Sequence, residues 1–226
     1  MILLIETATP VCSVALAEEG RILASKSCNE PNAHSSVLSV YINDIMGSVS
    51  LSDLAAVCVS SGPGSYTGLR IGTSTAKGLC YALRIPLLSV PTTQCMAAHY
   101  YRCHPDYNGM VCAMVDARRM ECYAAIYNRE GVVREVQADI VEPHCYDEFL
   151  DRGEVLFVGD GAPKTRQVLG VHPNARYDDS FVVSAEGMAD IARQKLNDGS
   201  HEDLAYFEPF YLKEFVAKKS TVRGLV

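Results

Sequence analysis

The sequence predicts an α/β protein with mixed sheets and two related halves. Short runs of aliphatic and β-branched residues alternate with stretches of helical periodicity, which is typical of strands and helices packed in layers. A hairpin pattern occurs twice, from Glu6 to Gly20 and from Asp116 to Gly131, each time with an acidic residue at its first turn. This weak repeat indicates two halves of one architecture. Two unrelated hairpins are the alternative explanation.

In the first half, three apolar runs separated by turn residues predict an antiparallel meander. Two further apolar runs follow, each separated from the preceding strand by a helical stretch. Because such a helical connection joins parallel strands, we expect these two runs to extend the meander into a mixed sheet. The expected elements are strands at 1–5, 12–17 and 21–26, a helix at 34–46, a strand at 54–60, a helix at 67–83 and a strand at 87–90.

A linker is expected at residues 103–109, which contain a proline and an Asn-Gly pair. We place a boundary there, between an N-terminal lobe at 1–103 and a smaller, degenerate C-terminal lobe at 104–226. Beyond Tyr211, a basic tail is expected to be disordered. The expected elements of this second lobe are strands at 110–115, 121–127, 132–136 and 155–158, and helices near 144–152 and at 163–169 and 184–197.

Composition is that of an ordinary globular protein, with 48% hydrophobic and 21% charged residues among 226. The formal net charge of −7 repels phosphate backbones, so the chain alone is not expected to bind nucleic acid. No uncharged apolar run is long enough to span a membrane, and residues 1–5 lack the features of a signal peptide. We therefore expect a cytoplasmic protein, with its nine scattered cysteines as reduced core thiols.

The most unusual segment is Ser60-Ser-Gly-Pro-Gly-Ser-Tyr-Thr-Gly-Leu-Arg-Ile-Gly72, between an expected strand and an expected helix. Backbone N–H groups at such a helix start can hold a phosphate. However, a P-loop needs Lys and Ser/Thr where Leu69 and Arg70 stand, and the dinucleotide fingerprint needs glycine at Thr67. The alternative is a tight strand-to-helix connection capped by Ser65 or Thr67.

This segment and four shorter motifs closely resemble the bacterial TsaB (YeaZ) family over nearly the whole chain. The resemblance implies a duplicated actin-like (ASKHA, ribonuclease H-like) fold with two lobes. It also implies a non-catalytic subunit that binds and activates the enzyme TsaD in tRNA threonylcarbamoyladenosine biosynthesis, the modification of the adenosine beside the anticodon. The shorter motifs are Glu6-Thr-Ala8, Asp116-Ala-Arg-Arg119, Gly159-Asp-Gly-Ala162 and Pro209-Phe-Tyr-Leu212.

The resemblance further implies a set of partners. TsaD forms a heterodimer with the chain, and the ATPase TsaE joins the larger complex. Contact with tRNA is expected only through that complex, and no membrane contact is expected. We expect a homodimer when TsaD is absent and no tightly bound cofactor, with ATP or ADP present only in the complex.

A partner interface is expected on the two helices of the first lobe. Apolar residues cover roughly 240° of the circumference of helix 34–46, more than the stripe of about 100° that one core contact requires. Small residues spaced by four along helix 67–83 would admit another helix closely, although packing within the same chain explains them equally well. The expected interface residues are His34, Val37, Val40, Tyr41, Gly68, Leu69, Gly72, Thr73 and Ala76.

The alternative of another class is an ATP-binding or ATP-hydrolysing enzyme. Its acidic turns would face nucleotide phosphates across a cleft, as in actin-like enzymes. Turn capping explains the same acids, and Arg118 or Arg119 would then neutralise Asp116 in a surface ion pair. The candidate phosphate-contacting residues are Glu6, Thr7, Asp116, Gly159, Asp160 and Gly161.

No metal site is expected, although the family's catalytic relative TsaD carries a His-x-x-x-His metal pair. Here Leu38 follows His34 at the fourth position, so a second ligand is absent. Cys95, His99 and Cys103 would suit zinc if their segment were helical, but a fourth ligand is not evident. A glycoprotease is the third alternative, and no G-x-S-x-G elbow supports it.

Overall fold

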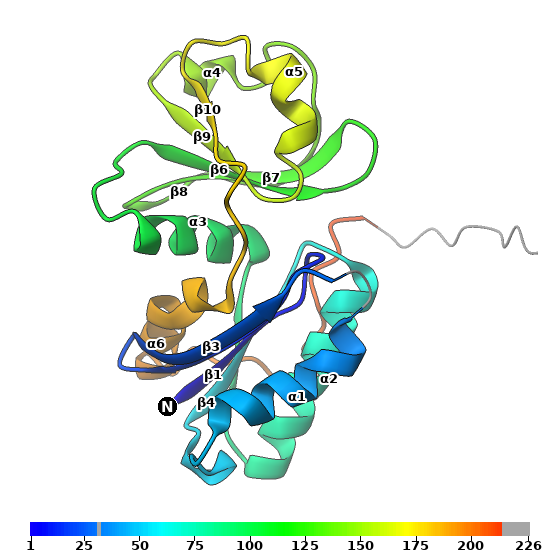
Figure 1. Ribbon diagram of the computed structural model, residues 1–226, viewed down its shortest axis with the longest axis vertical. Coiled ribbons are helices and arrows are strands. Elements are labelled where there is room, and N and C mark those ends of the chain that lie inside the picture. The colour runs from blue at the N-terminus through cyan, green and yellow to red at the C-terminus, as the bar shows by residue number, and fades with distance from the viewer. Residues whose placement is uncertain (31–32, 214–226) are drawn as a thin grey trace, which may run out of the picture.

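The computed structural model describes residues 1–30 and 33–213, and its strands form two five-stranded sheets (Figure 1). The first sheet has the order β3-β2-β1-β4-β5 and the second the order β8-β7-β6-β9-β10. The central strand of each sheet pairs antiparallel with one neighbour and parallel with the other. The expected mixed sheets and the internal repeat are therefore confirmed. The strands are β1 (Ile2–Glu6), β2 (Cys12–Glu18), β3 (Arg21–Cys28), β4 (Ala56–Ser60), β5 (Leu87–Val90), β6 (Met110–Asp116), β7 (Glu121–Asn128), β8 (Gly131–Ile140), β9 (Val155–Val158) and β10 (Ala175–Tyr177).

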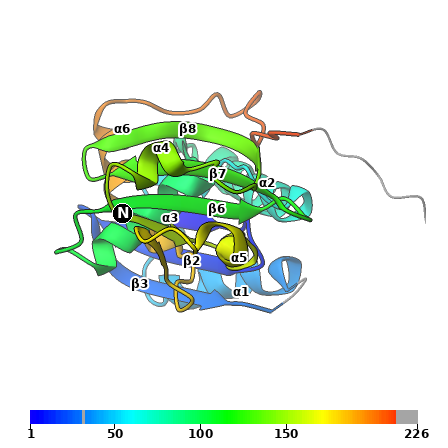
Figure 2. The same ribbon diagram turned by 90° about the horizontal axis from the view of Figure 1, so that it is seen from above.

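Helices cover both faces of each sheet, so the molecule has five layers (Figure 1). α1 (His34–Met46) and α2 (Tyr66–Leu83) cover the outer face of the first sheet. Seen from above, the short α4 (Asp147–Leu150) and α5 (Arg166–Leu169) lie over the second sheet (Figure 2). α3 (Thr92–Cys103), the 3-10 turn η3 (Ala185–Met188) and α6 (Ala189–Asn197) fill the space between the sheets.

Burial on both faces explains the uninterrupted apolar runs of the central strands. In β1, Leu3 and Ile5 face the helices α1 and α2, whereas Leu4 faces the layer between the sheets. All three side chains are fully buried. A strand covered on one face alternates apolar and polar residues, and a strand covered on both faces does not.

The last helix of each half packs against the sheet of the other half. α3 contacts β6 and β7 of the second sheet, and α6 contacts β1, β3 and β5 of the first. After α6, residues 200–213 follow the edge of the first lobe, where Glu202 forms a bridge with Leu87 and the Lys77 ammonium donates to the carbonyls of Ala205 and Phe207. The division of the chain between residues 103 and 104 stays a prediction. After the second sheet is complete, the chain returns to the first sheet with α6 and the residues that follow it.

Most expected elements are confirmed, and the larger differences lie in the helices of the second half. The expected helix 184–197 consists of the 3-10 turn η3 followed by α6. Helix 144–152 shortens to α4, and helix 163–169 divides into a 3-10 turn, η2 (Pro163–Thr165), and α5. The expected strand 54–60 is shorter in the structure, as β4, and it follows a further 3-10 turn, η1 (Leu51–Asp53). Within the described residues, no helix is both long and apolar enough to cross a membrane. Most of the expected basic tail, from residue 214 onward, lies outside the described residues.

Candidate functional site: the cleft between the lobes

A cleft of about 760 Å³ opens between the two lobes at the ends of their central strands. From the first lobe it is lined by Ala8 to Pro10, by His34 and by the start of α2. From the second lobe come Val115 to Arg118 and Asp160. Because β1 and β6 occupy equivalent places in the two sheets, the two acidic turns of the repeat both lead toward this cleft.

The glycine-rich segment forms the floor of the cleft by close approach of backbone to backbone. A Cβ atom at Gly64 would lie 2.3 Å from the Ala8 carbonyl oxygen, so only glycine fits there. Ser65 is the N-cap of α2, and its hydroxyl accepts a 3.2 Å hydrogen bond from the Gly68 N–H. The expected cap at Ser65 is confirmed, and Thr67 lies exposed in the first turn of the helix.

Glu6 caps the first turn from a fully buried position and does not line the cleft. Its Oε1 accepts a 2.6 Å hydrogen bond from the Ala8 N–H, whereas Oε2 has no hydrogen-bond partner in the described part of the chain. Burial raises the pKa of this carboxyl to about 7, against 4.5 for an ordinary glutamate. The neighbouring Thr7 is also buried, and its hydroxyl donates to the Gly68 carbonyl at 2.9 Å.

Asp116 and Asp160 are the candidate acids that do reach the cleft. The Asp160 Oδ1 accepts from the Asp116 N–H at 3.2 Å, and Asp116 forms an ion pair with Lys164. Asp160 is open to the cleft but enclosed by protein on its other sides, and this burial, together with Asp116, raises its pKa to about 6. Gly159 and Gly161 hold this turn against the backbone at the end of β6.

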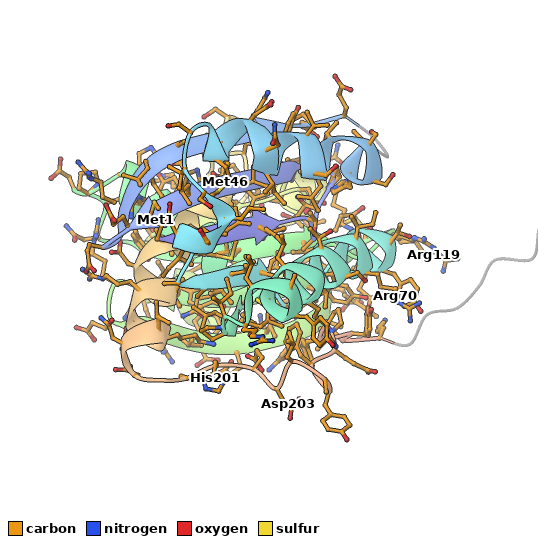
Figure 3. The ribbon with its side chains drawn as sticks, turned by 90° about the horizontal axis from the view of Figure 1, so that it is seen from below. Met1, Met46, Arg70, Arg119, His201 and Asp203 are labelled. Carbon is orange, nitrogen blue, oxygen red and sulfur yellow. The ribbon has the colours of Figure 1, made fainter. Side chains whose placement is uncertain are left out.

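The expected neutralisation of Asp116 by Arg118 or Arg119 is wrong. The Asp116 carboxylate accepts from the backbone N–H of Arg118 at 3.0 Å, while Lys164 supplies the positive charge. Both arginines have positive φ angles, 71° and 48°, and Arg119 extends outward at one end of the molecule (Figure 3). The carboxylate of Asp116 is therefore neutralised by Lys164 and not by an arginine of its own turn.

Residues 211–213 line the cleft from a part of the chain that the sequence did not link to it. The Tyr211 ring lies 5.0 Å from the Tyr66 ring, and the Arg70 guanidinium donates to the Tyr211 hydroxyl at 3.4 Å. Lys213 forms an ion pair with Glu121 of β7. The segment thus joins the start of α2 in one lobe to the second sheet in the other.

The expected interface residues divide into buried and exposed groups. On α1, Val40 is 51% exposed, Val37 and Tyr41 are half-buried, and His34 is buried with its Nε2–H donating to the Thr9 carbonyl at 2.9 Å. The expectation that the small-residue stripe of α2 forms a free surface is wrong, because it packs against the chain's own β1 turn and β4. The buried α2 residues are Gly68, Leu69, Gly72, Thr73 and Ala76.

The three zinc candidates do not converge on one point. The Cys95 thiol donates to the Ser184 carbonyl at 3.2 Å, and only His99 and Cys103 approach each other, with 3.9 Å between Nε2 and Sγ. Among residues 1–30 and 33–213, no group of three or more His, Cys, Asp or Glu side chains has a metal-binding arrangement. The segment is helical, as the zinc hypothesis required, but Cys95 is buried and Cys103 is exposed, so the candidates do not share one site.

Replacing Glu6 by glutamine (Glu6→Gln) is expected to stabilise the protein at and above neutral pH. The folded carboxyl keeps its proton up to about pH 7, whereas the unfolded carboxyl loses it near 4.5. The free energy of unfolding therefore falls as pH rises through this window, and the contribution of Glu6 is most favourable below it. A shift of this size corresponds to on the order of 3 kcal/mol. Glutamine keeps an acceptor for the Ala8 N–H without the charge.

Urea unfolding on either side of this pH window measures the effect. The stability difference between Glu6→Gln and the native chain should grow with pH, whereas Glu148→Gln, at an exposed surface ion pair, should show no such growth. A difference that does not change with pH would contradict the buried neutral carboxyl.

Comparison with known proteins identifies the family. Residues 26–207, more than half of the chain, match the family model described as TsaD: tRNA N6-adenosine threonylcarbamoyltransferase. A relative from Escherichia coli (strain K12), named tRNA threonylcarbamoyladenosine biosynthesis protein TsaB, is 34% identical over 230 residues, which are 96% of this chain and 96% of the relative.

Solved structures agree with that result. YeaZ from Pseudomonas aeruginosa superposes with a TM-score of 0.81 at 28% identity, over 93% of this chain and 99% of that one. Component A of (R)-2-hydroxyglutaryl-CoA dehydratase from Acidaminococcus fermentans has a TM-score of 0.52 at 9% identity, over 86% and 97% of the chains, a likeness of fold alone. The expected duplicated actin-like fold is confirmed, and the chain belongs to the TsaB (YeaZ) family.

Proposed function

We propose that this chain takes part in tRNA threonylcarbamoyladenosine biosynthesis as a non-catalytic subunit that binds and activates TsaD. Membership of the TsaB family supports the pathway, because relatives of similar length carry that name. The state of the cleft acids supports the non-catalytic role. Glu6 is buried beneath the cleft and Asp116 is engaged by Lys164, so neither carboxylate is free to hold a metal-bound phosphate.

The observation that carries partner binding is the exposed apolar side of α1. Val40 has more than half of its surface exposed, and the partly buried Val37 and Tyr41 lie beside it. α2 lies next to α1 on the same outer face of the sheet and exposes Tyr81 (Figure 1). Two adjacent helices with exposed apolar side chains suit a helical partner. In the absence of TsaD, a second copy of the chain would cover this face.

Replacing Val40 by aspartate (Val40→Asp) is expected to weaken TsaD binding by about 10²-fold, because a charge placed in an apolar contact loses its water without gaining a partner. The chain itself should stay folded, since the side chain is largely exposed. Val132→Asp is the matched control, at a valine of the second sheet that is 46% exposed. Titration of TsaD by calorimetry measures both. Equal affinities of the two variants would place the interface elsewhere.

Activity measurements test the subunit role directly. TsaD should modify tRNA faster when the chain is added, and the chain alone should show no transfer of a threonylcarbamoyl group. Modification by the chain alone, or no response of TsaD to it, would overturn the proposal. TsaE, tRNA, and ATP or ADP enter this proposal only as members of the complex, which we place in the cytoplasm.

The second candidate is an ATP-binding or ATP-hydrolysing enzyme, and the cleft itself favours it. Asp160 and the N-terminus of α2 both line this cavity of about 760 Å³, and a helix N-terminus can hold a phosphate. ATP turnover by the pure chain, lost in Asp116→Ala or Glu6→Ala, would favour the enzyme over the subunit. No arrangement in the described residues favours the glycoprotease alternative.

A further inference from the structure

Two cysteines lie directly opposite each other at the edge of the first sheet. In the antiparallel pair of β2 and β3, Cys12 and Cys28 are register partners. Opposed residues in such a pair have Cα atoms about 4.5–5.5 Å apart and side chains on the same face. A disulfide requires a Cα separation of roughly 4.4–6.8 Å, so the backbone already has a spacing that a disulfide can bridge. Both residues are free thiols in this structure.

Both cysteine side chains lie on the face of the first sheet that α1 covers. Cys12 is fully buried in the core cluster that contains Leu38 and Ile42, and Cys28 packs against the same cluster. Tyr41 of α1 interacts with Cys28, and this interaction is the largest of the causes that raise the pKa of the tyrosine. One helix therefore covers both thiols.

We propose that Cys12 and Cys28 are a reversible oxidative modification site that forms an intramolecular disulfide with a low-molecular-weight disulfide, such as glutathione disulfide, as the oxidant. Among the described residues, Cys12 and Cys28 are the one pair of cysteines that lie directly opposite each other on neighbouring strands. Cys112 faces Ile126 across its ladder, and Cys122 faces Asp116 and Asp139.

The accessibility of the two thiols sets the order of the steps. β3 is an edge strand and Cys28 is half-buried, so an oxidant reaches Cys28 first. Burial raises the pKa of the Cys12 thiol to about 12, which makes it a poor first nucleophile. Once Cys28 carries a glutathione, however, the neighbouring Cys12 has a high effective concentration at that sulfur.

The chemistry is two thiol–disulfide exchanges. The Cys28 thiolate attacks glutathione disulfide, whose S–S bond breaks, and one glutathione leaves as a thiolate. The Cys12 thiolate then attacks the Cys28 sulfur, the mixed disulfide breaks, and the second glutathione leaves. The two thiol protons end on the two glutathiones, and the protein loses the two electrons that the oxidant gains. Excess reduced thiol reverses both steps.

Mass spectrometry of the folded chain tests the proposal. The exposed Cys103 and Cys145 are first replaced (Cys103→Ser, Cys145→Ser) so that surface adducts do not interfere. After incubation with glutathione disulfide, the intact chain should lose the mass of two hydrogens. Alkylation of the remaining thiols in denaturant, followed by digestion, should then yield one linked peptide pair, Cys12 to Cys28. Dithiothreitol should restore the starting mass. Cys112 and Cys122 should be alkylated throughout, as internal controls.

A further variant in the same background, Cys28→Ala, tests whether the disulfide is specific to the pair of Cys12 and Cys28 or forms between any two reactive cysteines. It should show no cross-link, and a cross-link from Cys12 to any other cysteine in it would overturn the proposal. In the parent background, a glutathione adduct that persists on Cys28, or recovery of both thiols in alkylated form, would overturn it as well.

Discussion

Replacing Ala76 by arginine (Ala76→Arg) is expected to unfold the protein. Ala76 is 0% exposed, on the face of α2 that packs against the first sheet, within the cluster of Ile5, Leu38 and Val59. An arginine there places a long side chain and an unpaired charge in a filled apolar core, which costs several kcal/mol for the charge alone. Native domains have only about 5–15 kcal/mol of stability in total.

Circular dichroism melting and size-exclusion chromatography measure this outcome. Val40→Arg is the matched control, because it introduces the same side chain on the neighbouring helix at a position that is 51% exposed. The control should melt close to the native temperature, while Ala76→Arg should show no cooperative transition or a greatly lowered one. A folded Ala76→Arg protein with native melting would mean that this face of α2 is not part of the core.

Adding a single methyl group at Gly68 (Gly68→Ala) is expected to destabilise the protein by about 3 kcal/mol or more. A Cβ atom there would lie 2.1 Å from the backbone oxygen of Thr7, and a backbone atom cannot turn aside as a flexible side chain can. The first turn of α2 would have to move from the β1 turn. That movement also breaks the hydrogen bond from the Thr7 hydroxyl to the Gly68 carbonyl.

Gly78→Ala, in the same helix, is the control for helix propensity. Nothing lies within 4 Å of a Cβ atom at Gly78, so this substitution should stabilise the helix by up to about 1 kcal/mol. Urea unfolding of the two variants should therefore give changes of opposite sign. A similar small gain for both would show that α2 does not rest on Thr7.

The sequence predicts the elements whose ends carry local signals. β5 and β9 are short apolar runs between turn residues, and both were expected with their observed bounds. The sequence does not predict α3, because its apolar residues are not confined to one narrow stripe from which a helical period could be inferred. Its buried residues, among them Cys95, Met96 and Ala97, cover more than half of its circumference.

The site was less predictable, because its residues depend on long-range contacts. Gly68, Gly72 and Ala76 indicate close packing, but small residues pack equally well within a chain and between chains, and the sequence does not distinguish the two. The contact between Lys213 and Glu121 joins residues far apart in the chain. The Tyr-Leu motif before Lys213 was visible as a family feature, but nothing local indicated the lobe on which it rests.

The exchange of terminal helices between the halves has a consequence for synthesis on the ribosome. The inner face of the first sheet is complete in sequence once β5 emerges at Val90, but α6, which covers part of that face, begins only at Ala189. At ordinary translation rates the delay is roughly 5–20 s. A nascent chain therefore displays apolar side chains such as Leu4 and Leu88 throughout that interval, and it needs a chaperone or a provisional cover from its own α3 until the last helix arrives.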